Sequence, residues 1–587
     1  MAQKYGMWGN GTFTNNTSWN ALLPHIQGFN FRFSWSNIEP TAGNFDWTYF
    51  DGQLQHAFDA GIWVGFMIFA GPAAPIVAPA DWLHQAPFNV PRFTNERDTY
   101  PDYMATNYKP RWYNMLSAVC DHISNTYTTD QKNAILFWMS AEGSTGDEGP
   151  FHGTVLPPYQ YYEDPLSDEW ETFKRDSWTF QYDNITNSSF SNTRLLINQG
   201  NFGDNYQWAL DNTPTAWMKA GNFTHSYSDY ADLSYGDRLI ACRNSPSTDN
   251  RWRGEFEDIP DWWDDSPTQN LFAMLCNCLH VGLDIFNISY ATASSYGYLS
   301  NLWAFEFFTR HAGVRQASET NKGFCAFRDV LDINDTDRFP ETAPYGPVVD
   351  KNTGSYNSQL SAIISGSDPE TMKAYRITYL TIRNEPPPAV STYRFLSTNR
   401  IDAIHNDYPY ALYKFLTTVG LNDQKYLQDF SFDTIRGNWF RFVEEIDQYD
   451  NSKPAWRIGP TTDYFGRYAR RTAVAQGKTT RYFVCDPDLD SNGAGGNNVT
   501  ISVTYFDSGT ALWGVKAYTL KGPEEIMQMQ NRGTGQWITK EITFDGFVFG
   551  GNMTNGSDII FTNFSSTQDV TTALLEFTNN SKVIPVS

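Results

Sequence analysis

Residues 29–70 read FNFRFSWSNIEPTAGNFDWTYFDGQLQHAFDAGIWVGFMIFA and contain the pattern that recurs through the first half of the chain. Two apolar runs, at residues 29–35 and 63–70, flank a segment with helical spacing at residues 50–60. Apolar runs of this length, bounded by turn residues, are typical of buried strands. Two such strands joined through a helix run parallel, because the helix carries the chain back to the starting edge. The stretch therefore predicts a β-α-β unit.

The same alternation continues to about residue 315. Strands are predicted at residues 5–8, 29–35, 63–70, 135–141, 195–199, 217–221, 253–257 and 283–289. Helices are predicted at residues 18–26, 50–60, 110–126, 167–180, 206–212, 268–280 and 298–311. Eight strands with helices between most of them favour an α/β fold, a (β/α)₈ TIM barrel with long loops, over residues 1–315.

The pattern changes twice after the predicted barrel. Residues 316–454 read as a linking α/β region packed on the barrel, with short helical stretches such as 410–419 and 439–448. From residue 455 the chain is β-rich, with strands predicted at 480–485, 499–506, 512–520, 536–544, 558–562 and 573–577. Short strands separated by turn residues predict an antiparallel β-sandwich as an accessory domain over residues 455–587.

Charge and composition exclude several classes of function. The 587 residues include 42 Lys and Arg against 65 Asp and Glu, a net charge of −23, which argues against nucleic acid as a partner. No apolar run reaches the roughly 18–20 residues of a membrane helix. The first residues, MAQKYGMWGN, show no signal-peptide core. Either the protein is cytoplasmic, or it is secreted, periplasmic or on the cell surface after loss of a leader; we expect the second.

No cofactor or metal is expected. The six cysteines are scattered and show no zinc pattern, and no phosphate-binding or dinucleotide fingerprint occurs. Asp486, Asp488 and Asp490 have an acidic spacing, but this stretch lacks the Gly and Glu of a calcium-binding EF-hand loop. We therefore read it as a solvated turn.

Two predicted strand ends present carboxylates. The fourth strand ends in Glu142, and the seventh carries Arg253, Glu255 and Glu257 on one face, because side chains alternate along a strand. Barrel enzymes place catalysis at the C-terminal strand ends. Strands four and seven lie on opposite sides of such a barrel, so two acids there suit cleavage of a glycosidic bond. The alternative is that both acids form salt bridges that anchor loops.

Residues 32–47, RFSWSNIEPTAGNFDW, resemble the start of the retaining (β/α)₈ glycoside hydrolases of clan A. They are similar to the pattern R-x-x-W-x-x-I-E-P-x-x-G-x-F-x-W of the β-galactosidase and related families, and the resemblance covers roughly residues 5–315. It implies that Glu142 is the acid/base and Glu255 the nucleophile. A looser likeness, to the β-agarase and carrageenase type, implies algal galactans as substrates.

The sequence also departs from the pattern of that superfamily. Ala141 stands where an Asn that contacts the sugar 2-hydroxyl usually precedes the acid/base. Glu148, in the stretch Gly-Asp-Glu-Gly, is therefore kept as an alternative acid/base. Glu257, closer to the end of its strand, is kept as an alternative nucleophile.

Further candidates for substrate contact lie on the strands and loops around these acids. Arg32 is expected to hold the nucleophile or a sugar hydroxyl. Each of the others has a structural alternative as an ordinary core or loop residue. The predicted substrate-binding residues are Arg32, Trp35, Trp138, Glu148, His152, Asn198, His225, Tyr227, Glu257, Trp262 and Trp263.

These features together predict a retaining glycoside hydrolase. Its expected substrate is a β-linked oligo- or polysaccharide that contains galactose, of the algal galactan type and with or without sulfate groups. If the glycan is sulfated, Arg32, Arg253 or Lys219 would offset the negative charge of the chain. The alternatives are a hydrolase of another β-glycan and a catalytically inactive barrel that only binds glycan. The glycan is the one partner expected, and the oligomeric state is open.

Overall fold

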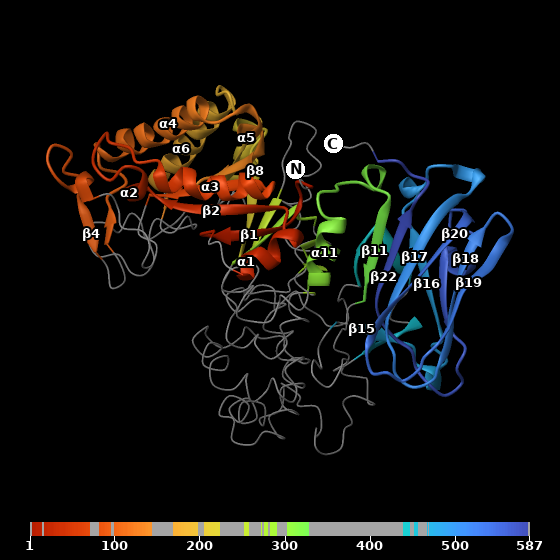
Figure 1. Cartoon of the computed structure of the whole chain (residues 1–587). Helices are drawn as coiled ribbons and strands as arrows, with labels where there is room; N and C mark the ends of the chain where they lie inside the picture. Colours follow the sequence, from red (N-terminus) through yellow and green to blue (C-terminus); the bar gives the residue numbers. More distant parts are fainter. Residues whose placement is uncertain are drawn as a thin grey trace, which may run out of the picture.

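The structure is a computed structural model of the chain. It describes residues 3–13, 17–70, 81–94, 99–143, 168–197, 205–222, 252–256, 282–289, 302–327, 438–446, 451–455 and 469–584, together with residues 272, 275–276, 278–279 and 467. Figure 1 shows two bodies: a parallel barrel built from the first half of the chain, and an antiparallel sheet built mainly from the last quarter.

The first body is a curled sheet of parallel strands whose order, β1-β10-β9-β8-β7-β6-β3-β2, closes on itself. Each strand pairs in parallel with its neighbours, and β1 pairs with both β2 and β10. The strands are β1 Gly6–Gly11, β2 Gly28–Ser34, β3 Trp63–Phe69, β6 Ile135–Met139, β7 Arg194–Ile197, β8 Trp217–Asn222, β9 Trp252–Phe256 and β10 Ile285–Ser289. The predicted parallel sheet is confirmed, and each predicted strand lies within a few residues of an observed one.

Helices cover the outside of this sheet. Those described after its strands are α1 Thr17–Leu22, α2 Trp35–Ile38, α3 Thr48–Ala60, α4 Tyr108–Thr126, α5 Thr129–Ala134, α6 Asp168–Thr186, α7 Asn205–Asn212 and α11 Leu302–His311. A short hairpin, β4 Arg92–Thr94 and β5 Thr99–Pro101, lies between β3 and α4. A large apolar cluster fills the space between strands and helices, and it includes Phe29, Phe31 and Phe33 from alternate positions of β2.

Aromatic rings plug the N-terminal end of the barrel interior. Trp8 stacks on Phe137 with ring centres 5.1 Å apart, and Trp217 lies 6.2 Å from Phe137. Two glycines make room for these rings. A Cβ on Gly28 would lie 2.6 Å from the Trp8 ring, and a Cβ on Gly65 would lie 2.2 Å from the Phe137 ring. A side chain at either position would therefore displace the plug.

The second body is a 12-stranded sheet whose main path runs β12-β11-β22-β17-β20-β18-β21-β16-β13. Its ends meet: β12 and β13 are adjacent in the chain, and Phe324 of β11 bridges to Phe442 between them. The sheet is thus rolled around its own apolar core. Its strands are β11 Lys322–Ala326, β12 Trp439–Arg441, β13 Val443–Ile446, β14 Lys453–Ala455, β15 Ala469–Arg471, β16 Thr480–Cys485, β17 Asn497–Phe506, β18 Leu512–Thr519, β19 Gly522–Gln530, β20 Trp537–Phe547, β21 Ile559–Asn563 and β22 Thr571–Asn579.

Two predictions for residues 316–454 need comment. The helix predicted at 439–448 is wrong, because residues 439–446 of this segment contain β12 and β13, and burial alternates along both strands. Phe442 between them has a φ of +61°, which breaks any helix. The helix predicted at 410–419 lies outside the described residues. Strands β11, β12 and β13 belong to the C-terminal sheet although they precede residue 455, and the predicted boundaries at 315 and 454 stay predictions.

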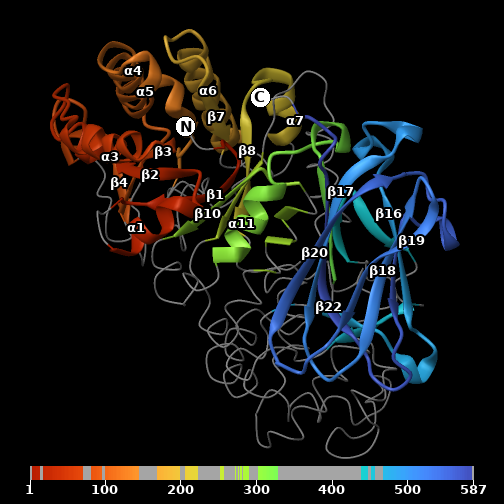
Figure 2. The same ribbon diagram turned by 45° about the vertical axis from the view of Figure 1, so that its right-hand side comes forward.

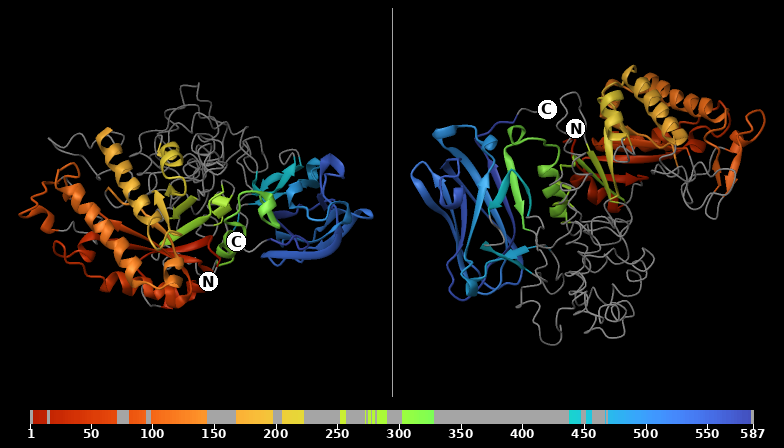
Figure 3. Two further views of the ribbon diagram at one scale, coloured as in Figure 1. Left: turned by 90° about the horizontal axis from the view of Figure 1, so that it is seen from above. Right: turned by 180° about the vertical axis from the view of Figure 1, so that it is seen from behind.

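The two bodies lie side by side, with α11 between them (Figures 2 and 3). Phe307 of α11 and Phe324 of β11 pack edge to face at 5.1 Å. Arg310 and His311 of α11 both contact the carboxylate of Glu576 on β22. Across the same junction the guanidinium of Arg467 lies 3.7 Å from the ring centre of Trp303. Apolar, aromatic and ionic contacts thus join the sheet to the barrel.

Among the helices in the described part of the chain, none combines the length and the apolar character that crossing a bilayer requires.

Candidate active site

A polar layer lies above the aromatic plug in the barrel. It contains Asn10, Asn30 and Asn287, which are 2 %, 0 % and 0 % exposed. The Oδ1 atom of Asn10 accepts hydrogen bonds from Asn30 Nδ2 at 3.4 Å and from Arg32 Nε at 3.2 Å. Arg32 lies one alternate position beyond Asn30 toward the C-terminal end of β2, and it is half-buried. Arg32 therefore faces the barrel interior, and its contact with a nucleophile or a sugar hydroxyl stays a prediction.

The predicted nucleophile lies beside this polar layer along the backbone. Glu255 of β9 is the register partner of Asn287 on β10, and Arg253 is the partner of Ile285. Ile285 belongs to the interior apolar cluster, and Asn287 is buried one alternate position further on. For Glu255 the structure describes the backbone position only, so its role as nucleophile stays a prediction.

Glu142 has a different setting from the one expected of an acid/base. It is 4 % exposed, and its carboxylate lies against helix α6. Its Oε1 accepts hydrogen bonds from Ser177 Oγ at 2.9 Å and Gln181 Nε2 at 2.6 Å. Its Oε2 accepts one from Trp178 Nε1 at 3.0 Å. Both oxygens are therefore occupied by donors of α6, and the carboxylate ties this helix to the end of β6.

Alternation along the strand explains this orientation. Met139 and Ala141 belong to the interior cluster of the barrel. Trp138 belongs to the cluster between strands and helices. Glu142 follows Ala141 and, like Trp138, lies on the helix side. Burial raises the pKa of Glu142, and the hydrogen bonds from Ser177, Trp178 and Gln181 counteract this only in part.

The motif that carries the family resemblance is a structural unit. Glu39 is 1 % exposed; its Oε2 accepts a hydrogen bond from Trp35 Nε1 at 2.8 Å, and its Oε1 accepts one from the backbone of Gly43 at 2.7 Å. Gly43 has a φ of +74°, which favours glycine. Trp82 Nε1 donates to the Glu39 carbonyl oxygen at 2.9 Å. The spacing W-x-x-x-E-x-x-x-G therefore fixes the turn that follows β2.

Trp35 and Trp138 are core residues in this structure. They are 0 % and 1 % exposed. Trp35 packs against Trp82 and Trp112, and Trp138 against Phe66. The stacking on sugar predicted for both rings has no exposed ring face through which to act.

The other predicted site residues lie outside the described part of the chain. They are Glu148, His152, Asn198, His225, Tyr227, Glu257, Trp262 and Trp263. Their predicted contacts with substrate stay predictions.

Two further features bear on possible ligands. A cavity of about 800 Å³ lies outside the barrel, between the N-terminal halves of α4 and α6, and its lining includes Lys109 and Asp176. It contains no predicted site residue. Within the described ranges no three His, Cys, Asp or Glu side chains gather as metal ligands would.

Sequence reasoning missed Asn10, Asn30 and Asn287. The signal was present for Asn30, which lies two positions before Arg32 in a predicted strand and hence on the same face. A buried Asn in an otherwise apolar strand is unusual enough to have been singled out.

No family model matches the chain, and no curated protein matches it. Among solved structures it is similar to a psychrophilic family 10 endo-β-1,4-xylanase, with 11% identity, a TM-score of 0.28, and 49% of this chain and 86% of the other covered. It is also similar to the cold-adapted β-galactosidase of Rahnella sp. R3, with 11% identity, a TM-score of 0.35, and 54% and 58% covered. A third is the exo-β-1,4-mannosidase of Opitutaceae bacterium strain TAV5, with 11% identity, a TM-score of 0.34, and 53% and 60% covered. The chain thus spans little more than half the length of the galactosidase and the mannosidase.

Proposed function

We propose that the chain is a retaining glycoside hydrolase that cleaves β-glycosidic bonds in a galactose-containing oligo- or polysaccharide. The observation that carries the proposal is the polar layer in the barrel, where Asn10 orients Arg32 of β2 and the buried Asn287 of β10 is the register partner of Glu255. A half-buried guanidinium above a buried amide layer can donate hydrogen bonds to sugar hydroxyl groups and to a carboxylate nucleophile.

The geometry of Glu142 favours Glu148 as the acid/base. A proton donor must reach the leaving-group oxygen within hydrogen-bond distance. The carboxylate of Glu142 is buried against α6 and accepts three hydrogen bonds there. Glu148 follows it by six residues, on the stretch that leads away from the same strand end. We therefore assign proton donation to Glu148 and the anchoring of α6 to Glu142.

The proposed reaction has two steps. The Glu255 carboxylate attacks the anomeric carbon while Glu148 gives its proton to the departing glycosidic oxygen, and a glycosyl-enzyme ester forms. Glu148, now a carboxylate, then takes a proton from water, which attacks the anomeric carbon and frees Glu255. Arg32 lowers the cost of holding a carboxylate in the barrel.

The substrate class rests on the resemblance of residues 32–47 and goes no further than a β-linked glycan with galactose. The same proposal places the protein outside the cytoplasm, because that is where an enzyme encounters a polysaccharide substrate. The competing proposal is a barrel that binds glycan without cleaving it.

One assay tests these proposals together. Purified protein is incubated with 4-nitrophenyl β-glycosides of several sugars and with agarose and carrageenan. We expect the wild-type chain to hydrolyse the galactoside, and we expect Glu255→Gln to lower the rate of hydrolysis by several orders of magnitude. Azide should restore activity to Glu148→Ala, because azide attacks the glycosyl-enzyme without needing a general base. Retention of polysaccharide without any hydrolysis would favour the binding-only barrel.

A further inference from the structure

The cavity of about 800 Å³ between α4 and α6 has the size of a small-molecule site, for which about 300–1,000 Å³ is typical. Among its described lining residues only Tyr103 and Phe173 are buried, and the others have exposed or half-exposed side chains. A ligand can therefore reach the cavity walls from solvent without any rearrangement of the helices.

The two helices close the cavity at the end away from their first turns. Trp112 Nε1 of α4 donates to Ser177 Oγ of α6 at 3.0 Å, and both residues are buried. The Tyr113 ring stacks on the Phe180 ring, with ring centres 4.0 Å apart and an angle of 10° between the planes. Tyr113 lines the cavity, so this wall is held in place by the protein itself.

The cavity lies at the level of the C-terminal strand ends. Helix α4 leads through α5 into β6, and α6 leads into β7, so the first turns of both helices lie at the end of the barrel where the strands stop. Glu142, just past β6, contacts Ser177 of α6. The cavity residues of α6, 169–176, precede Ser177 by up to eight residues, about 12 Å of helix. A glycan that lies across the strand ends and runs outward over β6 therefore meets the cavity.

The lining combines apolar surface with groups that form hydrogen bonds. Met104, Pro110 and Tyr113 offer apolar surface for the C–H groups of a pyranose ring. Thr106 and Thr172 carry hydroxyl groups that both donate and accept. A sugar unit presents the same combination, with C–H groups on its faces and hydroxyl groups around its edge.

The charges at the cavity disfavour an ionic ligand. Among the described lining residues, Glu169 and Asp176 bring two carboxylates against the one ammonium of Lys109, which pairs with Asp176 at 2.5 Å. A sulfate group would meet this negative lining in a chain whose net charge is already −23. A cation gains little, since the pair leaves only the exposed carboxylate of Glu169 to attract it. Sugar hydroxyls can donate to both carboxylates.

We propose that this cavity is a second sugar site, outside the barrel, which binds unsulfated units of the glycan. The assignment rests on the proposed function for the identity of the glycan. Units held in the cavity add to the affinity for a long chain, because the second binding event is intramolecular, and they contribute nothing to the binding of a single sugar in the barrel.

The test uses Thr172→Arg. The introduced guanidinium reaches Glu169, three residues before it on α6, and Asp176, four residues after it, so it fills the cavity and occupies both carboxylates. Such pairs support a helix, so Tm should stay the same or rise. The matched control is Thr186→Arg, the same change at an exposed position of α6 about 21 Å along the helix. Both variants gain the same charge, which keeps their electrophoretic mobilities comparable.

Native electrophoresis in polyacrylamide gels measures binding whether or not cleavage occurs. The gels contain agarose as the unsulfated probe or κ-carrageenan as the sulfated one. We expect agarose to retard the wild-type chain and Thr186→Arg equally, and to retard Thr172→Arg about fivefold less. In rate measurements, Thr172→Arg should lower kcat/KM on agarose about 3- to 10-fold and change kcat/KM on 4-nitrophenyl β-D-galactopyranoside by less than about twofold.

The gels also contain the outcomes that contradict the proposal. If agarose does not retard the wild-type chain, or retards Thr172→Arg as strongly as the wild-type chain, the cavity is not a sugar site. If Thr172→Arg loses as much retardation by κ-carrageenan as by agarose, the preference for unsulfated units is wrong. If the wild-type chain hydrolyses no glycoside, the proposed function fails, and the difference in retardation between Thr172→Arg and Thr186→Arg still decides the second site.

Discussion

Glu39 and Glu142 are buried carboxylates that accept hydrogen bonds at both oxygens, and both join the barrel strands to the layer outside them. Glu39 fixes the turn after β2 through Trp35 and Gly43. Glu142 fixes α6 through Ser177, Trp178 and Gln181. Removing a partner from such a group costs more than the bond itself is worth, since the remaining groups stay buried.

Glu142→Gln should destabilise the protein without abolishing catalysis. The NH₂ group of the introduced amide must face a group that is itself a donor, either Trp178 Nε1 or the pair Ser177 and Gln181, so at least one hydrogen bond is lost. We expect the free energy of unfolding to fall by about 2–3 kcal/mol. We expect Tm to fall by several degrees while activity per folded molecule keeps at least about a tenth of the wild-type value.

Glu148→Gln is the matched comparison. It should leave Tm within about a degree and abolish activity on substrates with poor leaving groups. The reverse pattern, a stable and inactive Glu142→Gln beside an active Glu148→Gln, would return the acid/base role to Glu142. Differential scanning fluorimetry and initial rates measure both variants.

At this scale the sequence predicts the faces of strand residues better than their partners. Arg32 faces the interior as alternation requires, and Glu142 lies on the helix side by the same alternation, because Met139 and Ala141 face the interior. The donors that hold the Glu142 carboxylate belong to α6, about 35 residues further along the chain. Single-strand patterns do not contain that information.

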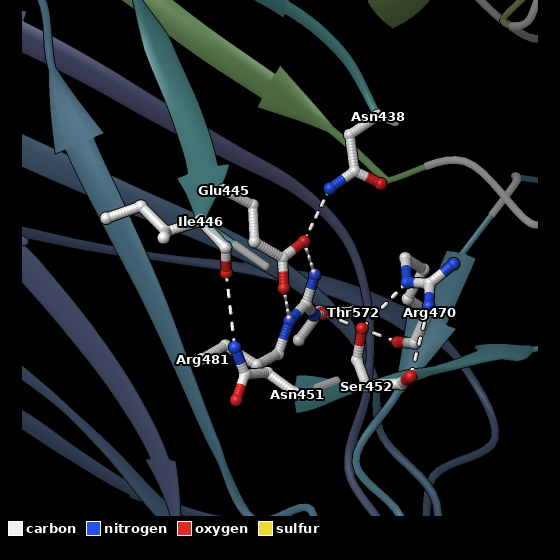
Figure 4. A network of polar contacts seen from close by, with 8 residues as sticks. All are labelled: Asn438, Glu445, Ile446, Asn451, Ser452, Arg470, Arg481 and Thr572. Carbon is white, nitrogen blue, oxygen red and sulfur yellow. Dashed lines mark hydrogen bonds and ion pairs between the residues drawn. The ribbon is translucent and has the colours of Figure 1, made fainter. Parts of the chain in front are cut away.

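The strands β13 and β16 are joined by a buried ion pair at the seam of the C-terminal sheet (Figure 4). Glu445 and Arg481 form two hydrogen bonds, at 2.6 and 2.7 Å, and their side chains are 0% and 1% exposed. Asn438 also donates to Glu445, and Arg481 also donates to Thr572 of β22. The guanidinium lies 3.8 Å from the ring centre of Phe327. The pair therefore connects three strands.

Arg481→Met should destabilise the C-terminal sheet by about 3–5 kcal/mol, because it leaves the Glu445 carboxylate buried without its partner. The double variant Glu445→Leu/Arg481→Met should recover most of that loss, since neither charge remains. Urea unfolding followed by tryptophan fluorescence measures both. A double variant as unstable as the single one would show that the loss comes from packing against Phe327 instead of from charge.

Elements with continuous apolar runs were predictable, and those at the edges were not. The six strands predicted after residue 455 all occur within a few residues of their predicted positions. Strand β19, GPEEIMQMQ, was missed because it is acidic, begins with Gly-Pro and is largely exposed. The sequence WFRFVEEI of β12 and β13 predicts a helix because it fits both periods when read without its turn at Phe442.

One carboxylate takes part in several polar contacts at the junction between the bodies. Glu576 of β22 accepts hydrogen bonds from Arg310 Nη2 at 2.9 Å and from His311 Nε2 at 2.9 Å. Burial alone would raise the pKa of Glu576, but the bonds from His311 and Arg310 outweigh it and lower the pKa to about 2. The ionised carboxylate therefore stabilises the docked arrangement.

Acid should weaken the junction. The folded pKa of about 2 lies below the ordinary value of 4.5, so the stabilisation is complete above about pH 4.5 and is lost as the pH falls toward 2. The loss amounts to about 3 kcal/mol. Glu576→Gln should show lower stability at pH 7 and a flatter profile between pH 5 and pH 2, measured by chemical denaturation at each pH. If the free energy of unfolding of Glu576→Gln changes with pH as steeply as that of the wild-type chain, other groups cause the acid sensitivity.

Removal of the chain after residue 450 should give poorly soluble protein. Leu574 of β22 and Phe324 of β11 belong to the same buried cluster as Phe307 and Phe308 of α11, so truncation exposes apolar surface on the barrel and leaves β11 without β22. Solubility and size-exclusion profiles test this. A soluble truncation with unchanged Tm would show that the sheet is an independent module.

The overall arrangement was the least accessible from sequence. Alternation of strands and helices predicted the barrel, because each unit forms between neighbours in the chain. The pairing of β11 with β22, and of β13 with β16, joins segments that no local pattern relates.

The placement of β11 beside β22 also dictates an order of events during synthesis. Residues 322–326 leave the ribosome about 250 residues before 571–579, the strand that pairs with β11, β15 and β17. The barrel strands are complete at residue 289, so that body can fold while the rest is still being made. The edge of β11 that pairs with β22 and the apolar side of α11 then stay exposed to solvent until residue 579 has emerged. A chaperone that shields strand edges would act in that interval, and ribosome stalling between residues 330 and 570 would be the step at which the nascent chain aggregates.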